Sequence, residues 1–542
     1  MLSYRRGKLK KSIIIILLAT TLIFNSCHRV ETETETKKAH SDVIDLSWYI
    51  NFSWFNTEWG NDSVSKAITK DLGVNINFVV PTGDPQDKLN SMMDSDSLPD
   101  LITLGWWEGQ ISTMIDEGKV FALDELADQY NTYFWKVTND QSVQWYTSDD
   151  GHIYQYPNSS FSPDDYNTYN RLASNETFLV RKDIYEAIGS PDMTTPEGFT
   201  SAVEKAAKMF PTVNDGKDSL IPVGCHEFSD TGCDSFDGFL FDFLAVPYME
   251  DGRAIDRLRN PDYVRWLKAF RKLGSEGLLK DDIFIDTRKQ MEEKIAKGQY
   301  FCMIYQRTDL VDAEMSLYRD NPDSIYIAVD GPKNMAGDDY KLPGTSINGW
   351  TVTLVSKNCS NPEKAIELIT YLISEKGQIM TWLGVEGETW DYDEDGIPRI
   401  KEEYRDMFNN NPTEFKEKFG ADSCYWMFQN DAMATKWLVD DENSPLTQLK
   451  EWTYPYTTYV GQYTITFDSK EDIYEIKKNA DKQWGNTLPK LLLASSDSEF
   501  DRIYNQFIKD RYEVYGYDQV LDALTEKMNE NIEKLGLKNE QN

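Results

Sequence analysis

Residues 344–390 constrain the fold most, because they predict a strand and a helix whose apolar faces must be buried on a sheet. Between positions 350 and 355, strongly apolar residues alternate with threonine, which is the period of a strand with one apolar face. A helix is expected to follow, with Asn361 as its N-cap, Pro362 at its first position and Gly377 as a left-handed C-terminal cap. The stretch therefore predicts an α/β fold.

Four short motifs carry a resemblance to a known family. They are "LPDLI" at 98–102, "GHIYQYP" at 151–157, "NPEKA" at 361–365 and "GVEGETW" at 384–390. In these motifs the chain resembles family 1 extracellular solute-binding proteins, and most of all the long lipoprotein subgroup that serves carbohydrate ABC importers. The resemblance implies a two-lobe, periplasmic-binding-protein-like fold of type II. Each lobe is then expected to be a mostly parallel sheet flanked by helices, and a hinge joins the two.

The chain length agrees with two lobes, because 542 residues exceed one ordinary hydrophobic core. The resemblance implies that residues 44–170 build the first part of the first lobe and 171–343 the second lobe. Residues 344–420 would return to the first lobe. The helical C-terminal part, 421–542, would belong mainly to the second lobe and the hinge.

The N-terminus predicts export. Five lysines and arginines precede the apolar run 13–24, which is too short to span a bilayer and is typical of a signal peptide, here 1–26. Ser26 before Cys27 resembles a bacterial lipobox, whose cysteine becomes lipidated; a plain secretory signal is the alternative. Residues 27–43 are polar and read as a flexible tether. We expect the chain to be lipid-anchored to the bacterial cell membrane, facing outside.

The net charge limits the partners. Removing the five positive charges of the signal peptide takes the formal charge from −35 to −40. Such a surface repels nucleic acid and anionic lipid and disfavours a polyanionic ligand. We therefore expect an uncharged guest such as a sugar, bound by a monomer that needs no cofactor.

The cysteines leave one alternative open. Five follow Cys27, an odd count that cannot pair completely within one chain: Cys225, Cys233, Cys302, Cys359 and Cys424. Unpaired thiols are the preferred interpretation, and a local Cys225–Cys233 bridge is the alternative. These two residues with His226 resemble half of a zinc site, but a second ligand pair does not follow, so no metal is expected there.

Aromatic and polar residues at predicted strand ends indicate the ligand site. In parallel sheets ligands bind beyond the carboxyl ends of the strands, and sugars need aromatic faces for their C–H patches and polar edges for their hydroxyls. The predicted ligand-binding residues are Trp54, Trp106, Trp107, Glu108, Glu227, Arg307, Asp309, Trp350, Glu388 and Trp390.

One acidic stretch resembles a calcium loop. Its acids stand at EF-hand positions 1, 3, 5 and 12, namely Asp391, Asp393, Asp395 and Glu402. Pro398, however, occupies a position where such a loop uses its backbone N–H, and the flanks read as strands. A hairpin with its turn at 393–396 is therefore preferred over calcium.

Three function classes remain. The resemblance implies a binding protein that closes two lobes on a carbohydrate and delivers it to an ABC permease without catalysis. We expect the carbohydrate to be an oligosaccharide. A surface glycan-binding lipoprotein without a transporter is the second class. An exported glycoside hydrolase is the third: on a strand, Glu386 and Glu388 would lie about 6.5 to 7 Å apart. Neighbours on one strand, however, place their carboxyls poorly on opposite sides of a scissile bond.

Overall fold

The computed structural model describes residues 43–169, 171–421, 427–468 and 470–537. The predicted signal peptide, Cys27, Cys424 and the tether up to Asp42 lie outside the described residues. Val43–Asn542 make one compact unit. Within the described ranges, no helix combines the length and the apolarity needed to cross a bilayer.

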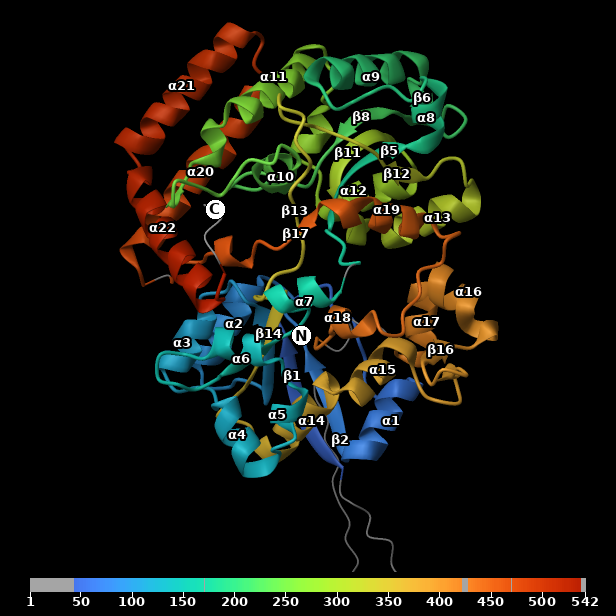
Figure 1. Ribbon diagram of the computed structural model, residues 1–542, viewed down its shortest axis with the longest axis vertical. Helices are drawn as coiled ribbons and strands as arrows, with labels where there is room; N and C mark the ends of the chain where they lie inside the picture. Colours follow the sequence, from blue (N-terminus) through green and yellow to red (C-terminus); the bar gives the residue numbers. More distant parts are fainter. Residues whose placement is uncertain (1–42, 170, 422–426, 469, 538–542) are drawn as a thin grey trace, which may run out of the picture. The chain divides into compact units, whose positions relative to one another are not determined.

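The first sheet has five strands in the order β2-β1-β3-β14-β4 (Figure 1). Their bounds are β1 (Ile44–Ile50), β2 (Val74–Val79), β3 (Leu101–Gly105), β4 (Gln155–Pro157) and β14 (Thr351–Val355). β1 runs parallel to both β2 and β3, whereas β14 is antiparallel to β3 and to β4. The strand predicted at 350–355 is confirmed, and it lies in the interior of this sheet.

Both faces of the first sheet are covered. Trp48 of β1 packs in one hydrophobic cluster and the next residue, Tyr49, in another, as the two-residue period of a strand requires. The expected single apolar face of β14 is therefore an incomplete description, because Thr351 and Thr353 are also fully buried. The covering helices, around the strands in Figure 1, are α1 (Ser63–Leu72), α2 (Pro85–Asp94), α3 (Gln110–Asp116), α4 (Leu123–Tyr130), α5 (Phe134–Val137), α6 (Asp140–Tyr146), α14 (Pro362–Ile373) and α15 (Glu375–Leu383). A further helix, α7 (Pro163–Thr168), follows β4 and has no buried residue.

The helix after β14 begins as predicted and ends earlier. The Asn361 side chain accepts from the Lys364 N–H at 3.2 Å, and Pro362 takes the first helical position. Gly377 is not a left-handed cap, because Ser374 ends α14 and its hydroxyl caps a second helix, α15. Gly377 lies in the first turn of α15, where a Cβ would approach the Tyr371 carbonyl oxygen to 2.0 Å. Glycine is needed at position 377 because two backbone segments approach closely there. It is not needed for a positive φ.

The second sheet has four strands in the order β12-β5-β11-β8. They are β5 (Glu176–Arg181), β8 (Ile221–Gly224), β11 (Tyr300–Gln306) and β12 (Tyr326–Ala328). Only the β11–β8 pairing is parallel; β5 is antiparallel to both neighbours. Both sheets are thus mixed, which corrects the expected mostly parallel arrangement. A strand that arrives from the other sheet needs no helical crossover, so it is free to enter antiparallel.

A second set of helices surrounds this sheet and continues into the C-terminal part (Figure 1). Trp484, Leu488 and Phe507 of the C-terminal helices share one hydrophobic cluster with the strands of the second sheet. The helices are α8 (Lys182–Ala187), α9 (Pro196–Met209), η1 (Ser235–Phe239), α10 (Leu240–Phe243), η2 (Arg257–Arg259), α11 (Pro261–Ser275), η3 (Asp281–Phe284), α12 (Arg288–Ala296), η4 (Arg307–Leu310), α13 (Val311–Asp320), α19 (Pro445–Thr453), η5 (Tyr454–Tyr456), η6 (Gly461–Tyr463), α20 (Asp472–Leu492), α21 (Asp497–Glu513) and α22 (Tyr517–Lys534). Three further helices pack beside α1 and α15 of the first sheet: α16 (Glu402–Asn410), α17 (Pro412–Phe419) and α18 (Asp431–Ala434).

The chain passes between the two sheets three times: from β4 to β5, from β12 to β14, and from α18 to α19, which packs on β12. The connecting segments bond to one another. β13 (Leu342–Pro343) pairs in parallel with β17 (Thr457–Thr458), and the Tyr166 hydroxyl donates to the Thr345 carbonyl at 2.8 Å. Three other short ribbons are β6 (Thr212–Val213) with β7 (Asp218–Ser219), β9 (Met249–Glu250) with β10 (Arg253–Ala254), and β15 (Trp390–Tyr392) with β16 (Pro398–Ile400).

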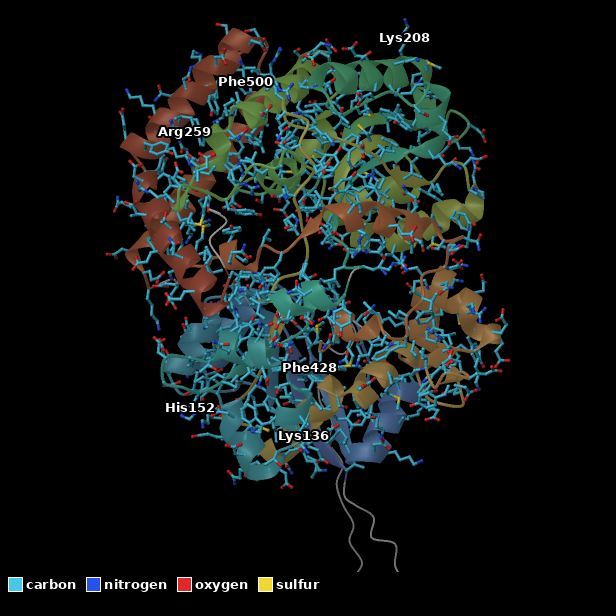
Figure 2. The ribbon with its side chains drawn as sticks, viewed as in Figure 1. Lys136, His152, Lys208, Arg259, Phe428 and Phe500 are labelled. Carbon is cyan, nitrogen blue, oxygen red and sulfur yellow. The ribbon has the colours of Figure 1, made fainter. Side chains whose placement is uncertain are left out.

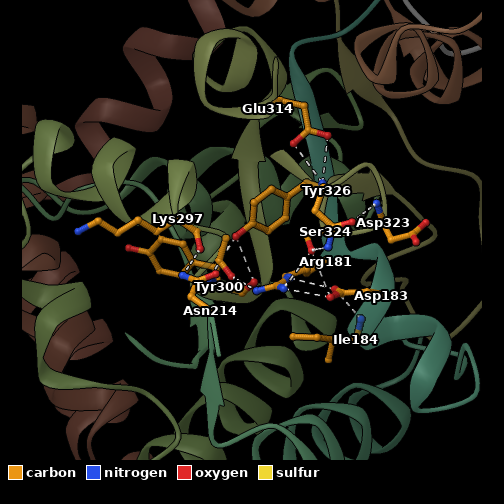
Figure 3. Close-up of polar contacts among 12 residues, drawn as sticks. Arg181, Asp183, Ile184, Asn214, Lys297, Tyr300, Glu314, Asp323, Ser324 and Tyr326 are labelled. Atoms are coloured by element: carbon orange, nitrogen blue, oxygen red, sulfur yellow. Dashed lines mark hydrogen bonds and ion pairs between the residues drawn. The ribbon is translucent and has the colours of Figure 1, made fainter. Parts of the chain in front are cut away.

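A buried polar network fixes one end of the second sheet (Figure 3). Arg181, at the end of β5, donates to both oxygens of Asp183 at 2.9 Å. Glu314 of α13 is fully buried, and its two oxygens accept from the Tyr326 N–H at 3.0 and 3.1 Å. The Tyr326 hydroxyl in turn bonds the backbone of Tyr300, so the network joins three strands and a helix.

Glu314 predicts a pH dependence of stability. Burial raises the pKa of Glu314 from 4.5 to about 8, although the hydrogen bond from the Tyr326 N–H works to lower it. Because the folded pKa exceeds the unfolded one, the stability it contributes is complete below about pH 4.5 and is lost as the pH rises towards 8. Glu314→Gln should therefore flatten the fall in melting temperature between pH 5 and pH 8. The exposed Glu186→Gln is the control, and an unchanged pH slope in Glu314→Gln would contradict the assignment.

Candidate ligand-binding site

An aromatic group lies at the carboxyl end of the first sheet. Trp54 follows β1 and Trp350 precedes β14, and antiparallel pairing of β14 with β3 brings these two ends to the same edge. The indole rings stack with centroids 5.8 Å apart and planes 13° apart, and Phe52 lies 5.3 Å from Trp350. Trp54 is 55% exposed, so the stack presents a ring to solvent. Phe52 was not in the predicted set, although it stands in the same loop.

A second aromatic pair follows β3. Trp106 and Trp107 meet edge to face at 5.9 Å, and Trp107 is 48% exposed. The Trp107 ring lies against the backbone of Gly105, where a Cβ would come within 2.5 Å of the indole. Glycine at the last position of β3 therefore allows Trp107 to fold back over the strand end and expose its other face.

Glu108 has a different role from the predicted one. It is 8% exposed, and its carboxylate accepts from Asn51 Nδ2 at 2.7 Å, from Gln86 Nε2 and from the Gly105 N–H at 3.1 Å. Its oxygens are occupied within the protein. Glu108 thus joins the loops after β1 and β3 to α2, and it positions the aromatic loops instead of offering a polar edge to a ligand.

The predicted residues of the second sheet gather around its own strand ends. Asp309 pairs with Arg288, the first residue of α12, and Glu227 follows β8. Burial works to lower the pKa of Arg288, but the negative charges of Asp309 and Glu227 are among those that raise it. Arg288 was not among the predicted residues, because it begins a helix and does not stand at the end of a strand. These three side chains form one charged cluster.

Arg307 lies apart from that cluster. Its Nε donates to the Ser174 carbonyl at 2.8 Å, and its backbone N–H donates to the Asn175 carbonyl. Ser174 belongs to the segment that leads from β4 into β5. Burial lowers the pKa of Arg307. The structure therefore places Arg307 at a connection between the two sheets.

Two other predicted residues stand elsewhere. Trp390 is 4% exposed, packs in a hydrophobic cluster with Leu383 and Trp437, and donates its Nε1–H to the Gly384 carbonyl at 2.8 Å. A buried ring offers no face to a ligand, so Trp390 leaves the candidate set. Glu388 is exposed in a turn and accepts from the Ser63 hydroxyl at 3.0 Å.

The geometry assumed for a hydrolase is not present. Glu386 and Glu388 are not on a strand but in a turn around Gly387, whose φ is +80°. Of the two described histidines, His152 pairs with Asp124 at 2.8 Å and is labelled in Figure 2. The other, His226, contacts the hydroxyl of Ser235, whose proton is already donated to the Ile304 carbonyl at 2.7 Å.

The acidic stretch after Trp390 is a hairpin, as preferred. The Asp393 carboxylate accepts from the backbone of Asp395 and Ile397 and from Arg399. Asp391 pairs with Lys401 at 3.4 Å. Cations and N–H groups of the protein occupy these oxygens, so the arrangement does not fit calcium. Among the described residues, no three acids, histidines or cysteines gather as a metal site.

The described cysteines are unpaired, which confirms the preferred interpretation. Cys225, Cys233, Cys302 and Cys359 are all free and buried.

A groove of about 690 Å³ lies between α9 and α11, but it is not a candidate ligand site. Its cations are engaged with acids, Arg271 with Asp497 and Lys268 with Asp501, so it offers a ligand little free charge.

Two mixed sheets joined by three crossings, with exposed aromatic rings at one set of strand ends, define a two-lobed solute-binding protein. The comparisons agree. The chain belongs to the bacterial extracellular solute-binding proteins, whose family profile matches residues 57–379.

Two relatives from other bacteria are similar in sequence. The fructooligosaccharide ABC transporter substrate-binding protein FusA of Streptococcus pneumoniae serotype 4 is 22% identical over 439 residues, 76% of this chain and 77% of its own length. Lipoprotein LipO of Bacillus subtilis is 21% identical over 348 residues, 61% of this chain and 64% of its own length.

Solved structures share the fold. FusA of S. pneumoniae in complex with kestose has a TM-score of 0.66 at 16% identity, covering 90% of this chain and 99% of that one. An HMO-binding ABC-transporter-associated solute-binding protein of Bifidobacterium longum infantis has a TM-score of 0.64 at 14% identity, covering 91% and 99%.

The role of Glu108 predicts a stability effect. Glu108→Ala removes the acceptor of three buried or half-buried donors, which should lower the free energy of unfolding by ~1–3 kcal/mol. The matched control is Glu388→Ala, which removes an exposed carboxylate with one hydroxyl contact and should change it by less than about 0.5 kcal/mol. Urea denaturation measures both variants. Equal effects in the two would contradict the positioning role.

Proposed function

We propose that this protein is the substrate-binding lipoprotein of an ABC importer and that it captures an uncharged oligosaccharide. The exposed Trp54–Trp350 stack at the strand ends of the first lobe carries the proposal. Exposed stacked indoles are costly in water, and they fit a ligand with apolar C–H faces. Family membership and the sugar-binding relatives support the same ligand class.

The proposed mechanism is closure without chemistry. The first lobe, built on the first sheet, supplies aromatic faces. The second lobe, built on the second sheet, supplies the polar cluster of Glu227, Arg288 and Asp309. A ligand that contacts both lobes stabilises the closed form by its differential affinity for it. We place the hinge in the three connections between the sheets, with residues 44–170 and 344–420 in the first lobe, 171–343 in the second, and 421–542 mainly in the second lobe and hinge.

The proposal includes a membrane anchor and a membrane partner. Cys27 would carry the lipid, residues 27–43 would act as a tether, and the closed monomer would dock on the permease outside the cell. The lipobox-like Ser26-Cys27 and the similarity to lipoprotein LipO support the anchor. The strongly negative surface agrees with an uncharged cargo.

A thermal-shift screen tests the ligand class. The chain from residue 28 onward is mixed with kestose, maltotriose, xylotriose and lacto-N-tetraose, and with a uronic-acid trisaccharide as the charged control. A neutral sugar that binds only the folded state should raise the melting temperature, and the stabilisation is about 2.7 kcal/mol at 100 times its Kd. A shift with the acidic sugar alone would contradict an uncharged cargo, and release of any product would contradict a pure binding role.

The aromatic stack predicts a loss of affinity. Trp54→Ala should weaken binding of the sugar that gives the largest shift by ~1–3 kcal/mol, because the ring that covers the sugar face is lost. Trp135→Ala is the matched control, since Trp135 is also partly exposed, at 37%, but lies on α5 away from the strand ends. Calorimetric titration measures both. Equal affinity of Trp54→Ala and the wild type would remove the stack from the site.

A further inference from the structure

Two stacked rings of the second lobe each carry a buried polar atom that has no hydrogen-bond partner. His226 follows β8 and Tyr305 lies near the end of β11, the parallel neighbour of β8. Their rings stack with centroids 4.4 Å apart and planes 22° apart. His226 is 6% exposed and Tyr305 fully buried, yet His226 Nε2 and the Tyr305 hydroxyl make no hydrogen bond. A buried polar atom without a partner is costly, so a native pair of them calls for an occupant.

The hydrogen-bond network determines what His226 offers. The Ser235 hydroxyl donates its proton to the Ile304 carbonyl at 2.7 Å and accepts from the His226 backbone N–H at 2.8 Å. His226 Nδ1 lies 2.9 Å from the same oxygen. Because the single proton of Ser235 is already donated, Nδ1 must carry the proton and donate. Nε2 is therefore a lone-pair acceptor.

Both rings are neutral. Burial, with a smaller contribution from the positive charge of Arg288, lowers the pKa of His226 to about 3. Burial raises the pKa of the Tyr305 phenol, so this hydroxyl keeps its proton and can donate it. The pair thus combines one acceptor and one donor, a set that an alcohol hydroxyl satisfies with its single proton and a lone pair.

The surroundings connect this pair to the proposed site. The charges that act on Tyr305 include Asp309, Arg288 and Glu227, which are the polar cluster at the strand ends of the second lobe. Arg288 is half-exposed and also acts on His226. His226 lies two residues after the end of β8 and Tyr305 one residue before the end of β11, so both rings stand at the strand ends of the second sheet. The Phe239 ring lies 4.9 Å from that of His226.

We propose that His226 Nε2 and the Tyr305 hydroxyl form a subsite for one hydroxyl group of the bound sugar. Nε2 accepts a hydrogen bond from the sugar O–H, and the Tyr305 O–H donates a hydrogen bond to the sugar oxygen. This inference rests on the proposed function and adds the polar contact of the second lobe. A sugar that lacks the hydroxyl at this place leaves both buried atoms unpaired and is discriminated against, so the pair determines specificity.

Tyr305→Phe tests the subsite without disturbing the fold, because the deleted hydroxyl has no partner in the free protein. The melting temperature of the free variant should equal or exceed that of the wild type. Its affinity, titrated with whichever of kestose, maltotriose, xylotriose or lacto-N-tetraose binds the wild type, should fall about 3- to 10-fold. The matched control is Tyr263→Phe, since Tyr263 is also fully buried with an unpartnered hydroxyl, but it lies on α11. Its affinity should not change.

Nitrogen-15 spectra of histidine-labelled protein add a second measurement. The free protein should show His226 protonated at Nδ1, assigned by comparison with His226→Gln, and the sugar should shift the Nε2 resonance. If the wild type binds a sugar while the Nε2 resonance and the affinity of Tyr305→Phe stay unchanged, the pair holds only a water molecule and the inference is overturned. If the wild type binds no sugar of the panel, the proposed function fails and the subsite fails with it.

Discussion

The first sheet depends on the return of β14 to a place between β3 and β4. The Thr103 hydroxyl bonds the Thr353 hydroxyl at 2.6 Å and accepts from Trp48 Nε1 at 2.8 Å, so a fully buried polar chain crosses β1, β3 and β14. Nearly two hundred residues separate β4 from β14 in the sequence, and they contain the whole second sheet. The second lobe is therefore an insertion whose two ends are held by strands of the first. The two main sheets share connections but no strand, and the proposed hinge lies in those connections.

The two lobes offer complementary chemistry at their strand ends. The first lobe exposes indole rings at its strand ends, and Glu108 joins two of the loops that carry them to α2. The second lobe carries charged side chains over a neutral His226–Tyr305 pair that has unused hydrogen-bonding capacity. A guest with flat apolar faces and hydroxyl edges would suit both surfaces, whereas an anionic guest would be repelled by a chain with a formal charge of −35.

Local signals predicted local structure well. The alternation at 350–355 and the Asn361-Pro362 start of α14 depend only on neighbouring residues, and both are confirmed. Signals that depend on distant partners failed. Gly377 looked like a helix cap, but the contact that requires glycine is the Tyr371 carbonyl, and Ser374 had already turned the chain. Trp390 looked like Trp107 in composition, yet Trp437, which is distant in the sequence, covers it.

The sequence by itself determined the α/β class, the family, the strand at 350–355 and the loops that hold the exposed tryptophans, because period, capping residues and turn residues act within a few positions. Only the tertiary structure decided which tryptophans stay exposed, that Glu108 positions loops, and that Arg288 joins Glu227 and Asp309. It also decided that His226 and Tyr305 lie side by side. Burial and hydrogen-bond satisfaction are properties of residues brought together from distant parts of the chain, and no local pattern records which partners will arrive.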